Sequence, residues 1–391
     1  MKWIFLACSL VMMWLDYRAT NRSVPADKQK LLRRTIATLW TLDLMTFIYG
    51  GFTYIFWSDN PTWMVISGMW LSFAYMTLVI ARGPLMLAMA FTQSTLLRIL
   101  GVVIWVYLAA LFIFSARVTR TDYLVNMVTI NSSSLPKAFD GYRILQLSDI
   151  HIGSLVDPET ELATIVDICN DQQADMIAFT GDLIDIRHSE LKPSITKHLQ
   201  RLQATDGVFS VTGNRDRGVG IRDTLTITTA YTTSSVIATQ RSMGWQVLDN
   251  CSTHIRRGDD SISVTGISFS HILQEKRHSS RLPSIDIADA HSNISKEEFN
   301  ITLSHIPQLW DTILDSYDAD LTLSGHVHAM QMKFPIGERG LSPSRLLYKR
   351  WSGLYEEQER WLYINDGIGG SMYPMRIGSN PEITVIELRC K

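Results

Sequence analysis

The apolar residues of this chain are concentrated at its N-terminal end, and this asymmetry constrains the fold more than any other feature. Residues 1–116 contain four long apolar runs, Trp3–Leu15, Thr35–Trp57, Trp63–Ala81 and Ile99–Ser115. A helix needs roughly 20 apolar residues, and no fewer than about 17, to cross a bilayer core. The last three runs reach this length, whereas the first could either span or lie at the interface. We therefore expect an all-α transmembrane region of three to four helices over residues 1–116.

The short first run also resembles a secretory signal sequence, which would be removed from the mature protein. Such a signal ends in small residues at a cleavage site. Here Asp16, Tyr17 and Arg18 follow the run instead. The sequence therefore predicts a permanent anchor.

The distribution of basic residues predicts how the helices are oriented. The loop after the first run carries Arg18, Arg22, Lys28, Lys30, Arg33 and Arg34. The next loop, Ser58–Thr62, carries none, and the third carries Arg82, with Arg98 at the start of the fourth run. Short loops rich in Lys and Arg face the cytoplasm. The fourth helix should therefore leave the membrane on the opposite side, which places the following domain on the non-cytoplasmic side whether or not the first run spans.

One acidic residue, Asp43, lies inside the second apolar run. An acid within a membrane helix often marks a transport or proton-relay site. Asp43 is also close enough to the basic loop for a polar helix contact, or for its carboxylate to reach the interface. Both interpretations stay open.

From about residue 140 the pattern changes to short strand-like runs, each of which ends in a polar motif. The runs are Tyr142–Leu147, Asp175–Thr180, Val208–Thr212, Ile301–Ser304 and Ala319–Ser324, with helical stretches such as Glu159–Gln173 and Leu191–Ala204 between them. Alternating strands and helices are typical of an α/β domain. Ligands gather at the carboxyl ends of the strands in such domains. We therefore expect the polar motifs to converge on one site.

The motifs supply metal ligands and no thiolate. They contribute Asp149, His151, Asp182, Asn214, His305, His326 and His328, and all ten histidines of the chain lie beyond residue 150. Carboxylate, imidazole and amide ligands suit Mn, Fe, Zn or Mg. Such a large set exceeds what one catalytic ion with open positions can use, and it suits two ions that share a carboxylate and together promote phosphoryl displacement. Each motif alone is weak, since a Gly-Asp or Gly-Asn after a strand is usually a turn; their order and shared placement carry the prediction.

In their order these motifs resemble the calcineurin-like metallophosphoesterase family. That family carries Asp-x-His, Gly-Asp-x-x-Asp, Gly-Asn-His-Asp/Glu, a further His and Gly-His-x-His, and the resemblance covers residues 140–391. It implies an α/β fold, a sandwich of two β-sheets flanked by helices, and a metal-dependent hydrolase of phosphoric esters or anhydrides. The tail Gly367–Leu388 resembles the branch with several N-terminal membrane helices. Residues 117–139 are then expected to be a linker between the membrane region and this domain.

The resemblance also implies a role for each motif residue. Asp149, His151 and His328 would hold one divalent ion, and Asn214, His305 and His326 the other, with Asp182 between them. Manganese is the expected metal, with Fe, Zn or Mg as alternatives. The expected catalytic residues beside the ions are Asp185, which would orient the site, Arg215 and Asp216.

Arg215 departs from the family pattern, which has His at this position. Arginine cannot protonate a leaving oxygen, because its pKa exceeds about 12. It can grip phosphate oxygens and neutralise developing charge. A site without a proton donor favours a good leaving group, such as the phosphate released from an anhydride. The substitution therefore predicts anhydride chemistry.

The string Gly-Asn-Arg-Asp at 213–216 resembles the UDP-2,3-diacylglucosamine pyrophosphatases of lipid A synthesis, which cleave an anhydride. A membrane anchor suits a lipid-linked substrate, so a phospholipid or glycolipid phosphate at the membrane is the expected partner. Those enzymes work on the cytoplasmic face, whereas the basic loops here predict the opposite side. An exported lipid diphosphate or nucleotide-sugar would satisfy both predictions.

Two other functions remain open. The domain could be a catalytically degenerate sensor or scaffold, for which Arg215 is the only sign, or part of a transporter that depends on Asp43. The near-neutral balance of 36 basic and 38 acidic residues argues against a nucleic-acid partner, which would call for a basic excess.

Two further features have more than one interpretation. Cys251 and Cys390 could form a disulfide in an oxidising compartment or remain as thiols. The segment Gly337–Trp351 contains Arg339, Arg345, Lys349 and Arg350. These basic residues could contact phosphates or an anionic membrane surface, or they could simply be solvated.

Overall fold

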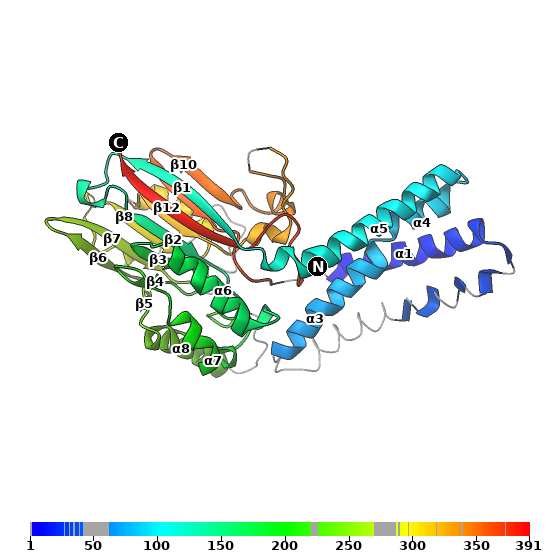
Figure 1. The fold of residues 1–391 in the computed structure, drawn as a ribbon, viewed down its shortest axis with the longest axis horizontal. Helices are drawn as coiled ribbons and strands as arrows, with labels where there is room; N and C mark the ends of the chain where they lie inside the picture. The colour runs from blue at the N-terminus through cyan, green and yellow to red at the C-terminus, as the bar shows by residue number, and fades with distance from the viewer. Residues whose placement is uncertain are drawn as a thin grey trace. The chain divides into compact units, whose positions relative to one another are not determined.

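The chain forms two compact units (Figure 1). The computed structural model describes residues 2–391 except 42–61, 220–225, 270–286 and positions 27, 31, 34, 35, 39, 288, 289, 296, 318, 338 and 372. The first unit comprises Met1–Val118 with Met372–Met375. The second comprises Thr119–Ser371 with Arg376–Lys391.

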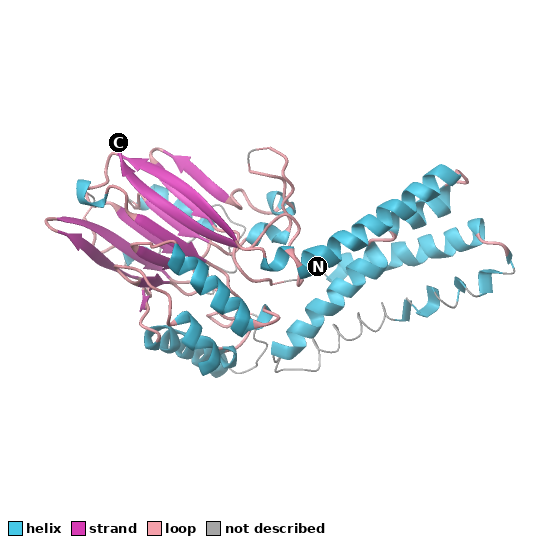
Figure 2. Ribbon diagram, in the orientation of Figure 1, coloured by secondary structure: helices cyan, strands magenta, loops and turns pink. Residues whose placement is uncertain are grey.

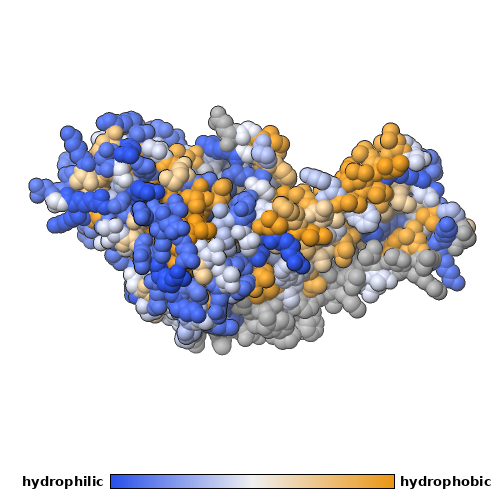
Figure 3. Space-filling model, in the orientation of Figure 1, coloured by the Kyte–Doolittle hydropathy of each residue, from blue (hydrophilic) through white to orange (hydrophobic). Residues whose placement is uncertain are grey.

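The first unit is helical, as the apolar runs predict. Its described elements are α1 (Lys2–Ser23), α3 (Thr62–Tyr75), a π-helix (Met76–Ile80), α4 (Gly83–Phe91) and α5 (Thr95–Arg117). Among the described residues, two stretches are long and apolar enough to cross a membrane, Ile66–Phe91 and Thr95–Thr121. Large apolar side chains along α5 are exposed, among them Leu96, Ile99 and Tyr107. Figure 3 shows this apolar surface over α4 and α5, which indicates a membrane protein, because water would penalise such exposure.

The second predicted run, Thr35–Trp57, falls mostly on residues outside the described part of the chain, and so does Asp43. The expected total of three to four membrane helices and the role of Asp43 therefore stay predictions. The first run does form a helix, and α1 extends well beyond its apolar residues to Ser23.

Arg82 is not a loop residue, which corrects the expectation from the sequence. It lies inside the apolar stretch Ile66–Phe91, between the π-helix and α4. Its guanidinium donates to Asp16 Oδ2 on α1 at 2.7 Å, and both side chains are buried. The indole N–H of Trp40 donates to the same oxygen at 2.9 Å. The ion pair neutralises Arg82, so its charge says nothing about which side the loop faces.

The turn after α4 is held to the end of α1. Arg98 donates to the carbonyl of Thr92 and to Ser23 Oγ, each at 2.8 Å. Ser23 Oγ in turn donates to the Met89 carbonyl at 2.7 Å. The basic end of α1 and the α4–α5 turn therefore lie at the same end of this unit.

The second unit is the predicted two-sheet sandwich flanked by helices (Figure 2). One sheet has the order β1 (Leu124–Ser132), β12 (Glu382–Cys390), β2 (Arg143–Leu147), β3 (Met176–Phe179), β4 (Val208–Ser210) and β5 (Gln246–Val247). The other has the order β10 (Gly353–Glu357), β11 (Arg360–Ile364), β9 (Leu321–Ser324), β8 (Asn300–Ser304), β7 (Asp260–Ile267) and β6 (Cys251–Arg257). The strands β2 to β5 are mutually parallel, as are β7, β8, β9 and β11.

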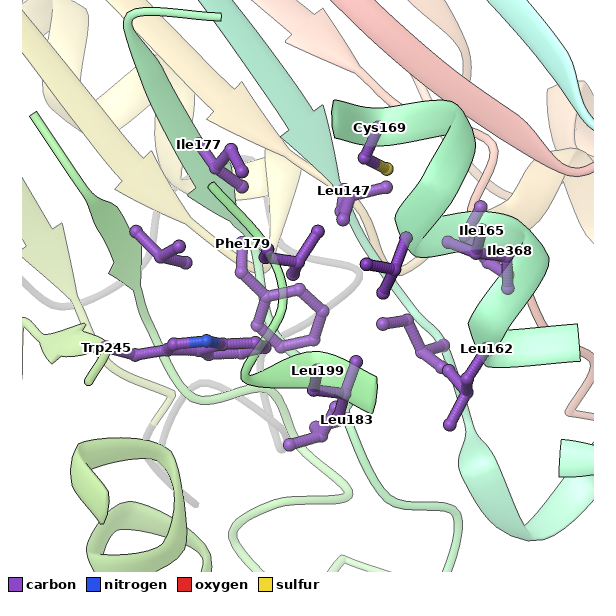
Figure 4. Packing of buried hydrophobic residues seen from close by; sticks show 14 of the residues in the cluster. Leu147, Leu162, Ile165, Cys169, Ile177, Phe179, Leu183, Leu199, Trp245 and Ile368 are labelled. Atoms are coloured by element: carbon purple, nitrogen blue, oxygen red, sulfur yellow. The ribbon is translucent and has the colours of Figure 1, made fainter. Parts of the chain in front are cut away.

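Alternation along the strands produces two hydrophobic layers. On β3, Met176 and Ala178 join the core between the sheets, whereas Ile177 and Phe179 join the core on the outer face. Successive side chains of a strand point to opposite faces, so a fully apolar strand has to be covered on both. The outer core includes residues of α6 (Pro158–Asp171), α7 (Pro193–Leu199) and α8 (Thr226–Ser242), as Figure 4 shows for Leu162, Ile165 and Leu199 around Phe179.

The two predicted helices differ in how well their bounds agree with the structure. Glu159–Gln173 corresponds closely to α6, which begins after Asp157, whose carboxylate accepts the Thr160 N–H. Leu191–Ala204 is too long, because α7 covers only Pro193–Leu199. Proline lacks an amide hydrogen and fits only the first turn of a helix, which explains why α7 begins there.

The expected linker, residues 117–139, contains a strand of the sandwich. Within it, β1 pairs in parallel with β12 from Leu124 opposite Glu382 to Ser132 opposite Cys390. Ile130 of this strand is buried in the core between the sheets. The second unit therefore begins at Thr119, not at residue 140. The partner of β1 lies at the far end of the chain, so no local pattern could reveal the pairing.

Candidate metal centre

The structure brings together the seven side chains that the sequence predicts as ligands. Asp149 and His151 follow β2, Asp182 follows β3, and Asn214 follows β4. In the other sheet His305 follows β8, and His326 and His328 follow β9. All five are parallel strands within their sheets, so their carboxyl ends meet at one edge of the sandwich.

The loops after these strands are tied to one another and bent sharply. The His151 N–H donates to the Asp182 carbonyl at 3.1 Å, and the Asp149 N–H donates to the Gly181 carbonyl at 2.9 Å. Five of the seven residues have left-handed backbone conformations, with φ of 53° at Asp149, 45° at His151, 59° at Asp182, 72° at His326 and 53° at His328. Each such conformation costs about 1–3 kcal/mol and persists mainly at functional sites. The bends turn neighbouring side chains toward a common point.

One ligand group consists of Asp149, His151 and His328. Their ligand atoms lie within 4.8 Å of one another. His328 Nε2 is 3.0 Å from Asp149 Oδ1 and 3.2 Å from His151 Nε2. All three side chains are buried. This is the set that the family resemblance assigns to the first ion.

A second group surrounds His305. Its Nε2 lies 3.1 Å from Asn214 Oδ1, 3.4 Å from Asp182 Oδ2 and 3.2 Å from His326 Nδ1. Its Nδ1 donates to the Thr180 carbonyl at 2.9 Å, so in the neutral imidazole Nε2 carries the lone pair. A lone pair that faces two oxygen acceptors is stable only if a cation or a proton lies between them. These residues therefore fit a divalent ion.

Asp182 stands between the two groups. Its Oδ2 is 3.7 Å from His151 Nε2 and 3.4 Å from His305 Nε2. Its other oxygen accepts the backbone N–H of Arg215 at 2.7 Å. Asp182 is thus in the place of a carboxylate that can be shared by two ions.

The pKa values of the histidines reflect the carboxylates that surround them in this cluster. Burial would lower the pKa of His151, but hydrogen bonds to Asp149 and Asp185 outweigh it and raise the pKa to about 10. Burial is likewise outweighed at His305, where Asp182 raises the pKa to about 9. At His328 burial prevails, and the pKa is lowered. Protons on His151 and His305 therefore supply positive charge that bound cations would otherwise supply.

Asp185 and Asp216 support the ligands in different ways. Asp185 Oδ1 is 3.3 Å from His151 Nδ1, so it can hold that ring with Nε2 toward the metal position. The Asp216 carboxylate accepts backbone N–H groups of Asp182 and Leu183 at 2.9 Å, Gly213 at 3.0 Å and Ile184 at 3.2 Å. Asp216 was expected beside the ions as a catalytic residue, but its carboxylate joins two ligand loops and positions them.

Glu190 plays a similar part, and sequence reasoning missed it. Its buried carboxylate accepts the backbone N–H groups of Asp185 at 2.7 Å, Ile186 at 2.8 Å, Arg187 at 2.9 Å and Gly153 at 3.0 Å. It thereby joins the loop after β3 to the loop after β2. No motif surrounds Glu190 in the sequence, so only its contacts identify it.

Arg376 was also missed. Its buried guanidinium donates five hydrogen bonds to the carbonyls of Asp366, Gly369 and Ser379. The loop that it holds lies against the ligands, because a Cβ on Gly367 would come within 2.9 Å of Asp149 Cβ and 3.0 Å of His328 Nδ1. The glycines at 367, 369 and 370 were the only sequence signal for this close approach.

Arg215 lies at the more open side of the centre. Unlike the buried ligands, Asn214, Arg215 and His326 are only half-buried. None of the described residues accepts a hydrogen bond from the Arg215 guanidinium. The side chain is therefore available to an anionic group that approaches the ligands.

A two-sheet α/β sandwich that gathers carboxylate and imidazole ligands at the ends of parallel strands has the architecture of a metal-dependent hydrolase. Residues 142–330 match the family model described as calcineurin-like phosphoesterase. The chain therefore carries a calcineurin-like metallophosphoesterase domain and is a metal-dependent phosphoesterase.

Curated relatives extend the comparison to about two thirds of the chain. The uncharacterized metallophosphoesterase YkuE of Bacillus subtilis is 29% identical over 266 residues, which are 67% of this chain and 84% of YkuE. The transmembrane protein with metallophosphoesterase domain of Danio rerio is 30% identical over 272 residues, which are 67% of this chain and 56% of that protein. Its Bos taurus counterpart is 30% identical over 278 residues, or 68% and 57%. The matched region is thus little more than half the length of the two vertebrate relatives.

Proposed function

We propose that the domain uses two divalent ions to hydrolyse a phosphoric anhydride in a lipid-linked or nucleotide-sugar-linked substrate at the membrane surface. The observation that best supports two metal ions is the short distance from His305 Nε2 to Asn214 Oδ1 and to Asp182 Oδ2. With the adjoining group of Asp149, His151 and His328, it supports two ion positions that share Asp182. Manganese suits the ligand set, although Fe, Zn and Mg do as well.

The protein's own residues would position the substrate and offset its charge. When bound, the two metal ions would stabilise the phosphate as Lewis acids and supply an activated water. Asp185 keeps His151 oriented, and Asp216 and Glu190 keep the ligand loops in place. The guanidinium of Arg215 would grip the non-bridging oxygens at the open side and offset their growing charge.

Arg215 supports an anhydride as the bond that is cleaved. Water forms the new P–O bond while the bridging P–O bond breaks, and the leaving phosphate departs as an anion. This anion needs no proton at neutral pH, whereas the alkoxide from a simple monoester does. The membrane helices support a lipid-linked leaving group, and a UDP-2,3-diacylglucosamine-like pyrophosphate is one candidate.

The test is hydrolysis by the purified full-length chain in detergent with added manganese. The panel would contain glycerol phosphate, glycerophosphocholine and a UDP-linked glycolipid, so that neither ester has an activated leaving group. Asp182→Asn is the site control, and Cys251→Ser is a control at an exposed residue of β6. We expect the glycolipid anhydride to be cleaved fastest, by an activity that Asp182→Asn abolishes and Cys251→Ser keeps. Faster cleavage of either ester would overturn the anhydride proposal while keeping the enzyme class. Manganese binding without turnover of any substrate would favour a sensor role.

A further inference from the structure

The segment after the last pair of ligand histidines exposes an unusual number of large apolar side chains. It runs from Lys333 to Lys349. Five of its residues, Phe334, Ile336, Leu341, Leu346 and Leu347, are exposed, and Leu346 reaches 87% exposure. Leaving such side chains in water costs about 25 cal/mol for each Å² of apolar surface. Scattered single apolar residues need no explanation, but a cluster on one segment does. We call these five residues the apolar loop patch.

The fold holds this segment in place with its apolar side chains outward. Phe334 and Leu341 exchange two backbone hydrogen bonds of 2.8 Å, which close a small hairpin. Ser342 is buried, and its hydroxyl donates to the Ala329 carbonyl at 2.6 Å, next to the ligand His328. Ser344 is buried as well. Small polar residues thus lie inside while large apolar residues lie outside, the reverse of the usual arrangement for a surface loop in water.

Exposed basic residues accompany the apolar loop patch. Arg345 is exposed and directly precedes Leu346 and Leu347. Lys349 has 70% of its side chain exposed, although it lies 3.3 Å from Asp311. Arg339 is exposed and packs over the Tyr355 ring. Apolar side chains that penetrate the acyl boundary, with cations at headgroup level, are the composition of a surface that binds an anionic bilayer.

We propose that the apolar loop patch inserts into the interface of an anionic lipid bilayer, with Arg345 and Lys349 at its headgroups. A membrane is the occupant that matches both the apolar and the basic residues, and the chain's own helices keep lipid at high local concentration. The inference goes beyond the proposed function and does not need the proposed chemistry. Its consequence for that chemistry is a metal centre kept close to the lipid surface, because the same segment carries Tyr348, whose ring is 6.5 Å from that of His326.

The test places a fluorescent probe on the patch of the full-length chain in lipid nanodiscs. Leu346→Cys would carry a bimane label, with Cys8, Cys251 and Cys390 changed to Ser and the buried Cys169 kept. The matched control is the same label at Gln358→Cys, an exposed polar turn between β10 and β11. In discs that contain phosphatidylglycerol, nitroxide-labelled lipid should quench the Leu346 probe at least several-fold more than the Gln358 probe. Iodide in the water should show the opposite preference.

Two further measurements decide the role of charge and exclude a protein partner. Arg345→Glu with Lys349→Glu should reduce lipid quenching in phosphatidylglycerol discs, with little change in discs of phosphatidylcholine alone. Equal iodide quenching at the two positions in every disc would overturn the proposal. So would shielding of Leu346 from iodide without quenching by nitroxide-labelled lipid, since that result would indicate contact with protein and not with lipid. None of these readouts uses turnover, so failure of the proposed chemistry leaves this test intact.

Discussion

His305 shows how a single hydrogen bond at the residue scale determines what a side chain can bind. Its Nδ1–H is taken by the Thr180 carbonyl, so Nε2 must accept a proton or a metal. The same logic applies to His151, whose Nδ1 faces Asp185. Arg215 differs from both, because its backbone N–H donates to Asp182, whereas none of the described residues accepts a hydrogen bond from its guanidinium.

The first prediction concerns the leaving group. Arg215→His should raise phosphomonoester hydrolysis relative to anhydride hydrolysis by about tenfold or more, because a positioned general acid contributes about 10²–10⁴ when the leaving oxygen needs a proton. The measurement is the ratio of kcat/KM for glycerol phosphate, whose alkoxide leaving group needs a proton, and for the UDP-linked glycolipid. Arg215→Lys serves as a control, since it keeps the charge without a usable acid. An unchanged ratio would remove the argument from the leaving group.

The second prediction concerns Arg376 as a positioning residue. Arg376→Ala leaves three buried carbonyls without their donor and frees the glycine loop that lies against Asp149 and His328. Residues that support ligands typically change metal affinity by 10–100-fold, so manganese affinity should fall by about that factor in titration calorimetry. Arg389→Ala, an exposed arginine on β12, should leave it unchanged. Equal affinities in the two variants would leave Arg376 with no influence on the site.

The third prediction concerns pH. Acidic neighbours raise the pKa of His151 to about 10 and that of His305 to about 9, despite burial. Both rings are therefore protonated at pH 7 without metal, and an ion must displace those protons to bind. Manganese affinity should rise with pH throughout the range from 6 to 9 and level off only near 10, the higher of the two pKa values. The observed heat of binding should depend on the ionisation enthalpy of the buffer, because binding releases protons. An affinity that stays constant from pH 6 to 9 would contradict this picture.

At the scale of elements, the ligands are placed by the ends of the strands and by the loops that follow them. Buried carboxylates hold these loops together through hydrogen bonds. Asp216 ties the loop after β3 to the loop after β4, and Glu190 ties the loop after β3 to the loop after β2. The strands need their own neighbours as well. β12 lies between β1 and β2, so the first sheet includes a segment that the sequence alone predicted to be a linker.

The fourth prediction tests that strand. Ile130→Ala should destabilise the full-length chain by about 2–5 kcal/mol, because it opens a cavity in the core between the sheets. Met127→Ala, on the same strand but exposed, should have an effect within about 0.5 kcal/mol. Denaturant unfolding followed by near-ultraviolet circular dichroism measures both. If β1 were a linker, the two variants would unfold alike.

At the scale of the whole molecule, charge distribution predicts the side of the membrane on which the domain lies. Removing Arg82 from the count leaves the basic residues after α1 and Arg98 at the start of α5. Arg98 donates a hydrogen bond to Ser23 at the end of α1, so both basic segments lie at the same end of the helical unit. The four cysteines are free thiols, and Cys251 and Cys390 belong to strands of different sheets.

The fifth prediction uses Cys251, which is exposed on β6. If the domain lies on the non-cytoplasmic side, a membrane-impermeant maleimide should label Cys251 in intact cells. Cys251→Ser identifies any label on the other thiols. If Cys251 is labelled only in permeabilised cells, the predicted orientation is wrong and the domain lies in the cytoplasm. That location would agree with the cytoplasmic location of the lipid A pyrophosphatases.

The sequence by itself determined the division into a membrane part and an α/β domain, the five strand ends and the seven proposed ligands. These features are local: an apolar run, a strand and the motif that ends it lie within a few residues of each other, so periodicity and composition reveal them. Parallel strand topology then brings the motifs to one edge, which made the convergence of the site predictable as well.

Tertiary structure alone decided the pairing of β1 with β12, the neutralisation of Arg82 by Asp16, and the supporting roles of Glu190, Asp216 and Arg376. Each of these rests on a hydrogen bond or ion pair whose donor and acceptor become neighbours only on folding. A buried charge is stable only when such partners are present. Because residue type and local spacing do not encode which distant group will be that partner, these roles could be assigned only after the chain had folded around them.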